Sequence, residues 1–310
     1  MRAFHILTLS VLTSLPSMAG AQVLFFDDFE GGTSAGNYSL VADTTRPPGT
    51  TGNPASDSFD AAFSFTDLGD SSDVRTGTGA QFLTEDAYTA FVSGVTIDGS
   101  QPIKISYDLY ANPSSSGSTE YSFVGVGSGA LPFQHYLRGS EIGNEETDGV
   151  FAGGLTDSDT AADGDYVVLE GVGAGSPTDL FNADAALSNY VGTSFSDILP
   201  PLTPGPSGES TPGRVLQHRW VNVSLTILGD RALYALNGTI VADVTASGPI
   251  TGLAGFGIGD PFPSSNQGGR IPPTPNTELI IDNVLIEVVP EPTSLGLAVV
   301  GGLLGFRRRR

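Results

Sequence analysis

The segment WVNVSLTILGDRALYALNGTIVADVT, residues Trp220–Thr245, decides the fold of this chain. From Val221 to Ile227 apolar residues alternate with polar ones, which is the period of a half-buried β-strand. Gly229-Asp230 and Asn237-Gly238 interrupt the alternation, and Asn-Gly is the preferred pair of a two-residue type I′ hairpin turn. The segment therefore predicts a three-stranded antiparallel meander.

Similar short runs lie on both sides of the meander. They are rich in β-branched and aromatic residues, are bounded by Gly, Pro, Asn and Asp, and show no amphipathic helical period. This pattern predicts one all-β domain over residues 22–289, an antiparallel β-sandwich or jelly roll. The additional strands are expected at Val23–Phe29, Phe59–Thr66, Ala87–Val92, Ile103–Ala111, Glu120–Val126, Tyr166–Glu170, Ala254–Ile258 and Glu278–Val288.

The charge balance excludes one class of partner. The chain of 310 residues has 34 acidic and 13 basic residues, a net charge of −21, and no cysteine. So negative a surface repels phosphate backbones, so nucleic-acid binding is not expected. Without disulfides, stability must come from the core or from bound ions. The carboxylates either solubilise the surface or, in part, hold calcium.

The N-terminus has the pattern of a secretory signal peptide over residues 1–21. Basic Arg2 precedes an apolar run from Ile6 to Leu15, and the small residues Ala19 and Ala21 form an A-x-A cleavage site. We therefore expect a signal peptidase to cut before Gln22.

The C-terminus, residues 290–310, has the pattern of a second address segment. Pro290, Glu291 and Pro292 precede an apolar run, Thr293–Phe306, that would span about 21 Å as a helix, short for a bilayer. Four arginines close the chain, and by the positive-inside rule they stay cytoplasmic and leave the body outside the inner membrane. An ordinary single-pass anchor is the alternative. The arginines are Arg307, Arg308, Arg309 and Arg310.

Taken together, these C-terminal features resemble the PEP-CTERM sorting signal. The resemblance covers only about the last 21 residues. It implies recognition of Pro290-Glu291-Pro292 by an exosortase-type enzyme, after transient anchoring in the inner membrane of a Gram-negative bacterium. Release to the cell surface or to an exopolysaccharide matrix would follow.

The order of strands in the body resembles the concanavalin A-like lectin/glucanase superfamily, including laminin-G-like jelly rolls. The similar features are an opening Leu24–Glu30 strand, the meander from Trp220, and a closing Ile280–Val288 strand. The resemblance implies that the first and last strands pair. It also raises the expectation of a structural calcium ion.

No catalytic constellation is visible. Apart from His5 in the signal peptide, the only histidines are His135 and His218, and no G-x-S-x-G motif occurs. Jelly-roll glucanases carry alternating carboxylates on one strand, but Glu141–Glu146 has Gly143 where the central aspartate should be. The chain is therefore expected not to be an enzyme, with a glycoside hydrolase or polysaccharide lyase as the alternative.

Two kinds of site remain open. If the first and last strands pair, Asp28, Glu30 and Asp282 could converge on calcium, which favours carboxylate oxygens; the alternative is that they face water. Carbohydrate binding usually needs exposed aromatic rings, for which Tyr110, Tyr136 and Tyr190 are candidates, whereas Trp220 is expected in the core. The sequence as a whole predicts an exported surface or biofilm-matrix protein with a non-catalytic domain that binds polysaccharide.

Overall fold

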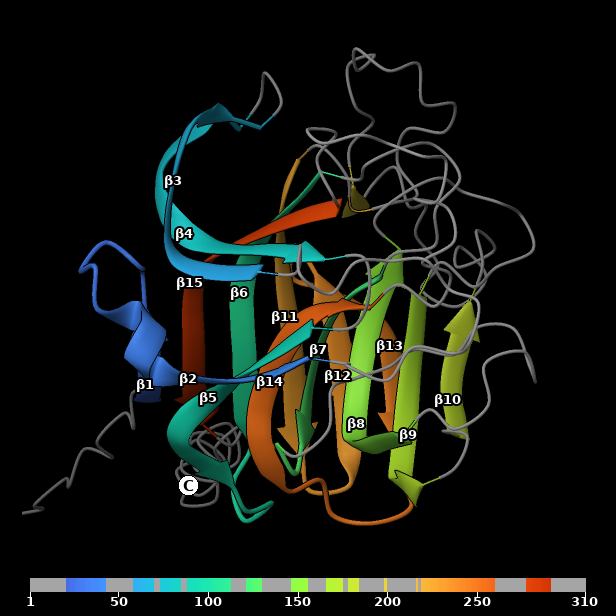
Figure 1. Ribbon diagram of the computed structural model, residues 1–310. Helices are drawn as coiled ribbons and strands as arrows, with labels where there is room; N and C mark the ends of the chain where they lie inside the picture. The colour runs from blue at the N-terminus through green and yellow to red at the C-terminus, as the bar shows by residue number, and fades with distance from the viewer. Residues whose placement is uncertain are drawn as a thin grey trace, which may run out of the picture.

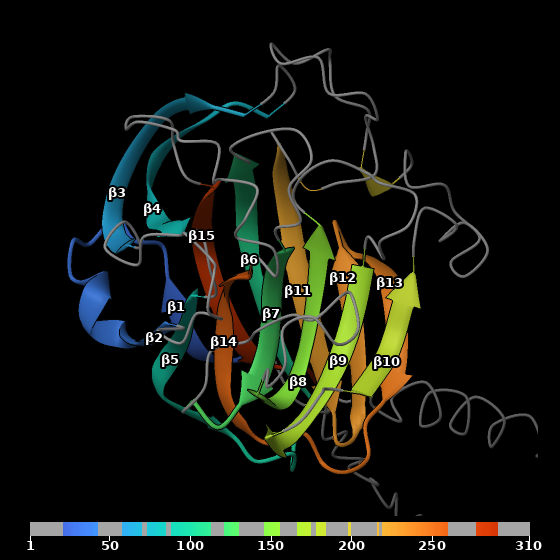
Figure 2. The same cartoon turned by 45° about the vertical axis from the view of Figure 1, so that its right-hand side comes forward.

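The computed structural model describes residues 21–42, 58–69, 73–84, 88–112, 121–129, 146–155, 166–174, 178–183, 198–199, 216, 219–259 and 277–290. Apart from one short 3-10 helix, η1 (Ser34–Asn37), the elements described below are strands. They form two antiparallel sheets that pack face to face, as Figures 1 and 2 show from two directions. The predicted all-β sandwich is confirmed.

The larger sheet, sheet A, has eight strands in this part of the chain. Its order is β13-β12-β11-β6-β15-β4-β3, and β1 also pairs with β15. The strands are β1 (Gln22–Asp27), β3 (Ser58–Leu68), β4 (Arg75–Thr84), β6 (Ile103–Asn112), β11 (Trp220–Leu228), β12 (Arg231–Leu236), β13 (Thr239–Thr245) and β15 (Thr277–Val288).

The second sheet, sheet B, has seven strands over the same described ranges, in the order β10-β9-β8-β7-β14-β5-β2. The strands are β2 (Tyr38–Ala42), β5 (Tyr88–Ile97), β7 (Tyr121–Gly127), β8 (Glu146–Leu155), β9 (Tyr166–Ala174), β10 (Thr178–Ala183) and β14 (Gly252–Gly259).

The meander from Trp220 is confirmed as β11, β12 and β13. Val223 pairs with Leu236, and Arg231 pairs with Thr245. Asn237 and Gly238 both have positive φ, 48° and 79°, as the predicted type I′ turn requires. The eight other predicted strands are also present, with ends shifted by a few residues.

Four strands, β2, β4, β8 and β10, were not predicted from the sequence. In β4 the glycines explain the omission, because Gly77 and Gly79 look like turn residues. They lie instead under the ring of Phe65, and a Cβ on Gly79 would come within 3.3 Å of that ring and 2.9 Å of the carbonyl oxygen of Ile281. These glycines therefore mark a close approach within a sheet, not a turn.

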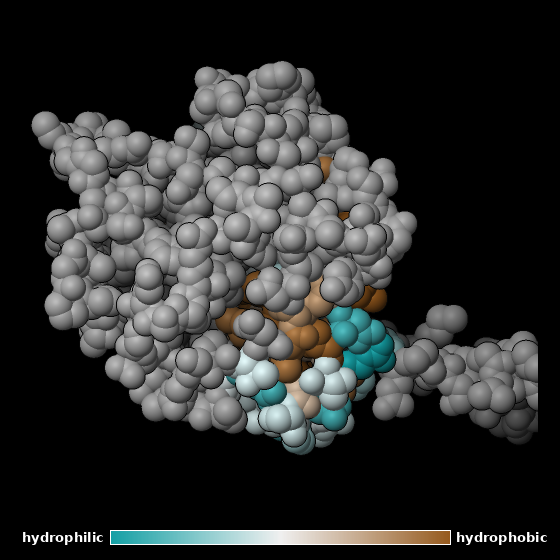
Figure 3. Space-filling view, turned by 90° about the vertical axis from the view of Figure 1, so that its right-hand side faces the viewer, coloured by the Kyte–Doolittle hydropathy of each residue, from teal (hydrophilic) through white to brown (hydrophobic). Residues whose placement is uncertain are grey.

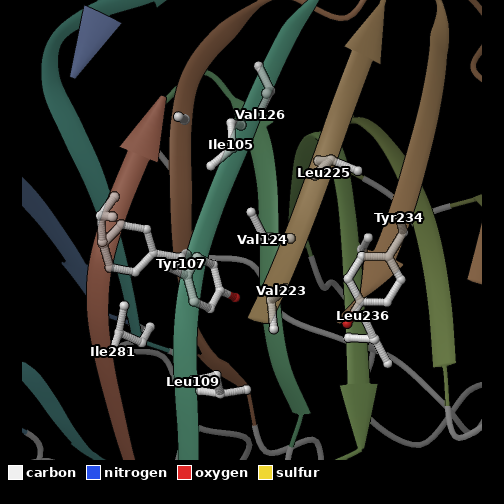
Figure 4. Packing of buried hydrophobic residues seen from close by; sticks show 14 of the residues in the cluster. Ile105, Tyr107, Leu109, Val124, Val126, Val223, Leu225, Tyr234, Leu236 and Ile281 are labelled. Carbon is white, nitrogen blue, oxygen red and sulfur yellow. The ribbon is translucent and has the colours of Figure 1, made fainter. Parts of the chain in front are cut away.

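The main core fills the space between the sheets. Figure 4 shows side chains from both sheets meeting there, among them Ile105, Tyr107 and Leu109 of β6 and Val124 of β7. All four are fully buried. The hydroxyl of Tyr107 donates a hydrogen bond of 3.2 Å to the carbonyl oxygen of Phe123, which satisfies this buried polar group across the interface.

The closing strand, β15, bends at one bulge. Asp282 pairs with Asp108 of β6, but the next pair is Leu285 with Ser106, so β15 carries one extra residue. Asn283 sits there with φ of 54°. Before the bulge β15 pairs with β4, and after it with β1. The first and last strands pair as predicted.

A second bulge turns the β3–β4 hairpin over the outer face of sheet A. Between Asp60 and Phe63, β3 has one residue more than β4, which reverses the side that following residues face. Ala61 thus belongs to the main core, whereas Phe63 and Phe65 join a separate cluster with Trp220. Figure 1 shows the strong curvature of β3 and β4 in this hairpin.

The turn after β1 is organised by a buried carboxylate. Asp27 is 7% exposed, and its oxygens accept hydrogen bonds from the backbone N–H of Phe29 (2.9 Å) and from the side chains of Ser34 (2.7 Å), Asn37 (2.9 Å) and Tyr38 (3.1 Å). Burial, together with the charge of Asp27, raises the pKa of Tyr38. This set of bonds fixes η1 and places Phe29 in the core.

We predict that Asp27→Ala lowers the free energy of unfolding by about 3 kcal/mol. Hydrogen bonds to a charged group each contribute about 1.5–3 kcal/mol, and the substitution leaves buried donors without their acceptor. Urea unfolding measures the loss. The matched control is Asp28→Ala, which removes an exposed neighbour and should change stability by less than about 0.5 kcal/mol. Equal losses in the two variants would contradict the role of Asp27.

Candidate functional site

The three carboxylates predicted to bind calcium occupy different surroundings. Asp28 is exposed, and its Oδ1 accepts the backbone N–H of Glu30 at 3.2 Å. The Oε1 atom of Glu30 accepts the backbone N–H of Thr78 at 2.9 Å, which ties the turn to the β3–β4 hairpin. Asp282 lies on β15, close enough to Glu30 for the two charges to interact.

Among the described residues, no group of three or more acidic or histidine side chains is placed to hold a metal ion. Asp28, Glu30 and Asp282 are not brought together as such a group. The alternation along β1 contributes to this, because it turns Asp27 inward and leaves Asp28 exposed. Calcium binding by the chain as a whole stays a prediction.

Asp108, on β6, is the centre of a polar network on the outer face of sheet A. Its Oδ2 accepts hydrogen bonds from Arg75 Nη1 at 2.8 Å and from Asn283 Nδ2 at 3.3 Å. Its Oδ1 accepts one from Asn222 Nδ2 at 2.9 Å. The network thus joins β4, β6, β11 and β15 through one carboxylate.

Arg75 connects this network to the only tryptophan of the chain. Its Nε and Nη2 atoms bond Asp73 at 3.0 and 2.7 Å, and these bonds raise the pKa of the guanidinium. The same guanidinium lies 4.8 Å from the centre of the Trp220 ring, a cation–π contact. Arg75 therefore attaches the hairpin to the sheet, and its contacts with Asp73, Asp108 and Trp220 are called the Arg75 clasp below.

Asp282 faces Asp108 directly across the strand pair. Burial raises the pKa of Asp282 to about 6, and the charges of Asp108 and Glu30 add to the rise. The backbone N–H of Asn283, at 2.7 Å from Oδ1, and the charge of Arg75 act in the opposite direction. Two carboxylates thus face one another within the network, and one of them titrates near neutral pH.

The aromatic residues predicted to bind sugar are not exposed where the structure describes them. Tyr110 is 7% exposed, because its ring packs beside Trp220 at 5.6 Å between centres. The expectation of an exposed platform at Tyr110 is therefore wrong. Tyr136 and Tyr190 lie outside the described residues. Trp220, 6% exposed, is buried as predicted, but in the separate cluster under the hairpin.

The predicted processing residues flank the sandwich. Ala21 and Pro290 are exposed and border β1 and β15, while Ala19, Glu291, Pro292 and Arg307–Arg310 lie outside the described residues. Over the ranges that the structure describes, no helix is long and apolar enough to cross a membrane.

A groove of about 480 Å³ opens at the other end of the sandwich, between β10 and β13. These are the end strands of the two sheets and lie in contact with one another. Figure 3 looks onto this edge and shows apolar surface bordered by hydrophilic residues. The lining residues are Leu180, Phe181, Thr239, Ile240, Val241, Ala242, Asp243 and Val244.

The groove combines apolar and polar groups. Phe181 is partly buried against the core, and Ile240 is 46% exposed. Asp243 lines the groove and forms a two-bonded ion pair with Arg231, whose Nε lies 2.6 Å from Oδ1. This hydrogen bonding lowers the pKa of Asp243, so the carboxylate is charged at neutral pH. Such a lining, mostly apolar with a few polar groups, is typical of small-molecule sites.

Among known proteins, similarity to this chain was found in solved structures alone. No protein-family model matches it, and no curated protein matches it. Solved structures similar to it include a carbohydrate binding module from Bacillus subtilis, with 11% identity, a TM-score of 0.38, and coverage of 67% of this chain and 86% of that one. At this level the similarity says nothing of ligands for this chain.

Two further structures are similar over more of the chain. A protein of unknown function with a galectin-like fold from Bacillus subtilis has 10% identity and a TM-score of 0.38, covering 86% of this chain and 97% of that one. A cellulose induced protein has 10% identity and a TM-score of 0.43, covering 84% and 96%. These values, too, carry no functional inference.

Sequence reasoning missed both Arg75 and Asp108. They are 33 positions apart and meet only because the hairpin curls over the sheet. The signal that could have found the curl is the pair Phe63 and Phe65, which face Gly79 and Gly77 in the following strand. The groove had no sequence signal, since its two strands lie far apart in the chain.

We predict that Asp282→Asn stabilises the protein at pH 7.5 by about 1–2 kcal/mol, as for a half-buried carboxyl. The folded pKa of about 6 lies above the usual 3.8, so stability is lost as pH rises through 6 and Asp282 must ionise. At pH 3, below both values, the variant and the wild type should differ little. Urea unfolding at the two pH values measures the change.

The control for this prediction is Asp98→Asn. Hydrogen bonds from Ser100 lower the pKa of Asp98, so its ionised form is favoured in the folded state. Removing it should slightly reduce stability at pH 7.5, the opposite sign to Asp282→Asn. A pH-independent effect of Asp282→Asn would contradict the raised pKa.

Proposed function

We propose that this chain is an exported protein whose non-catalytic sandwich domain binds polysaccharide in the groove between β10 and β13. The observation that carries the proposal is the groove lining, with Phe181 to stack on a sugar face and Thr239 and Asp243 to bond hydroxyl groups. Both bordering strands are the ends of their sheets, so in the described part of the chain neither has a strand neighbour on that side.

The shape and charge of the groove favour an extended, uncharged glycan. Because β13 contributes consecutive residues from Thr239 to Val244, the groove follows the strand for several residues. Asp243 and the overall charge of −21 disfavour uronic acids or sulfated sugars. The ion pair with Arg231 holds the carboxylate in a fixed orientation, which reduces the ordering cost of binding.

Export and surface sorting belong to the same proposal. Over the described residues, the first strand begins at Gln22 and the last ends at Val288, close in sequence to the signal-peptide pattern and to the PEP-CTERM-like pattern. We propose processing by a signal peptidase and an exosortase-type enzyme in a Gram-negative bacterium, then release to the surface or matrix. The basis for this part is the sequence pattern alone.

The network at Asp108 favours a structural role over catalysis. Both oxygens of Asp108 accept hydrogen bonds from Arg75, Asn222 and Asn283 in the closed arrangement. A general acid or base needs an open path to substrate. This observation supports the interpretation that Asp108 has a structural and not a catalytic role in the domain.

We predict that Ile240→Arg weakens binding of a neutral polysaccharide about tenfold or more, because the added side chain fills the groove. Binding of the full chain would first be surveyed on an array of neutral and acidic bacterial and algal glycans. Calorimetry with a neutral hit then measures the change in Kd.

The control is Leu40→Arg, which makes the same kind of change, from an exposed aliphatic side chain to arginine, at another place. Leu40 is 42% exposed on β2, an end strand of sheet B remote from β10 in the strand order. It should leave Kd unchanged. Failure of every neutral glycan to bind, or equal effects of the two substitutions, would count against the groove.

A further inference from the structure

The β3–β4 hairpin covers a pair of aromatic rings on the outer face of sheet A. Trp220 and Tyr110 are register partners on β11 and β6, and their ring centres lie 5.6 Å apart. They occupy the face on which Asp108 and Asn222 also lie, not the face that packs on sheet B. Without the hairpin, these four side chains would form one surface.

The cover itself comes from the distal half of the hairpin. Phe63, Phe65 and Leu68 pack on the aromatic pair, and the Phe65 ring lies 5.3 Å from that of Trp220. A Cβ on Gly69 would come within 3.1 Å of Trp220, so the chain passes close to the indole. The two rings are consequently almost completely buried.

The cover packs on the sheet through a small cluster that is separate from the main core. The ladder between β4 and β15 runs from Thr84 only to Ala80. Beyond it, polar contacts of the hairpin include the Arg75–Asp108 pair, the bond from Trp220 Nε1 to the carbonyl oxygen of Leu68 at 2.9 Å, and that from Thr78 N–H to Glu30. A segment held by a small satellite cluster and isolated polar bonds opens at lower cost than a core strand.

We propose that the distal half of the β3–β4 hairpin is a lid over a second glycan site, in which Trp220 and Tyr110 stack on sugar rings and Asp108 and Asn222 bond sugar hydroxyls. Aromatic faces beside carboxylate and amide groups provide the stacking and the polar contacts that such a ligand needs. Opening would withdraw Arg75 from Asp108 and leave its Oδ2 as an acceptor.

Among the described side chains around the Arg75 clasp, carboxylates outnumber positively charged groups. Arg75 faces Asp73 and Asp108 directly, with Asp282 and Glu30 on the neighbouring β15 and β1–η1 turn. When Asp282 is ionised, its repulsion of Asp108 competes with Arg75 and loosens the network. Lid opening should therefore be favoured at pH 7.5 over pH 5. The same excess of negative charge disfavours an acidic sugar.

The single tryptophan makes the lid observable in the full chain. We predict that Arg75→Met red-shifts Trp220 emission and increases its quenching by acrylamide, since the cation–π contact and the clasp are both lost. Affinity for a neutral gluco-oligosaccharide such as cellohexaose should rise roughly tenfold, because apparent affinity scales with the open fraction. Wild-type amides of residues 62–69 and 73–79 should exchange with deuterium faster than those of β11.

Arg231→Met is the matched control, because it breaks another arginine–aspartate pair on the opposite edge of sheet A. It should leave Trp220 emission and quenching unchanged. Trp220→Phe retains an apolar ring under the lid and should weaken the oligosaccharide affinity of the Arg75→Met protein.

The outcomes separate this site from the groove. Binding that survives Ile240→Arg and is strengthened by Arg75→Met supports the lidded site. Binding that is lost in Ile240→Arg and insensitive to Arg75→Met supports the groove and overturns the lidded site. Exposure of Trp220 without any gain in oligosaccharide affinity, slow exchange of the hairpin amides, or unchanged quenching in Arg75→Met also overturns it.

Discussion

The extra residue in β15 is the constraint on which the rest of the structure depends. At Asn283 the strand exchanges one neighbour, β4, for another, β1, while it remains paired with β6 on its other edge. The bulge keeps Ile281 and Val284 on the core side, although three positions separate them. Asp282, directly before the bulge, pairs with Asp108. The bulge at Asn283 thus lies where the β4–β15 ladder ends and where the β1–β15 ladder that closes the domain begins. It also lies beside the polar network of Asp108.

Much of the fold could be predicted because alternation of polar and apolar residues is a local signal. The meander from Trp220, its Asn-Gly turn and the closing strand followed from it. Strands containing several glycines, such as β8 with Gly149, Gly153 and Gly154, could not be recognised. In a sequence, a glycine predicts a turn, and only the structure shows that it lies in a strand because another residue packs closely against it. The bulge in β15 was present in the sequence as the break in spacing between Ile281 and Val284.

The candidate sites were less predictable, because they depend on register and on curvature. Pairing of β1 with β15 was correctly expected, yet a shift of one residue decides whether Asp27 or Asp28 faces inward. The inward residue organises a turn, and the outward one lies in water. Likewise, the contact of Arg75 with Trp220 and Asp108 requires a bulge in β3 that bends the hairpin by an amount no local pattern specifies.

The position of β15 also determines how the domain would respond to mechanical load. Its C-terminal residue, Val288, is paired with Ile103 on one side and Gln22 on the other, so a pull on the chain beyond it acts on two ladders at once. Such a pull, applied along the strand against the ligand proposed at β13, would load many hydrogen bonds in shear. A pull on Gln22 against Val288 would instead open the β1–β15 ladder one pair at a time. The fold is thus strong along one direction of force and weak along another.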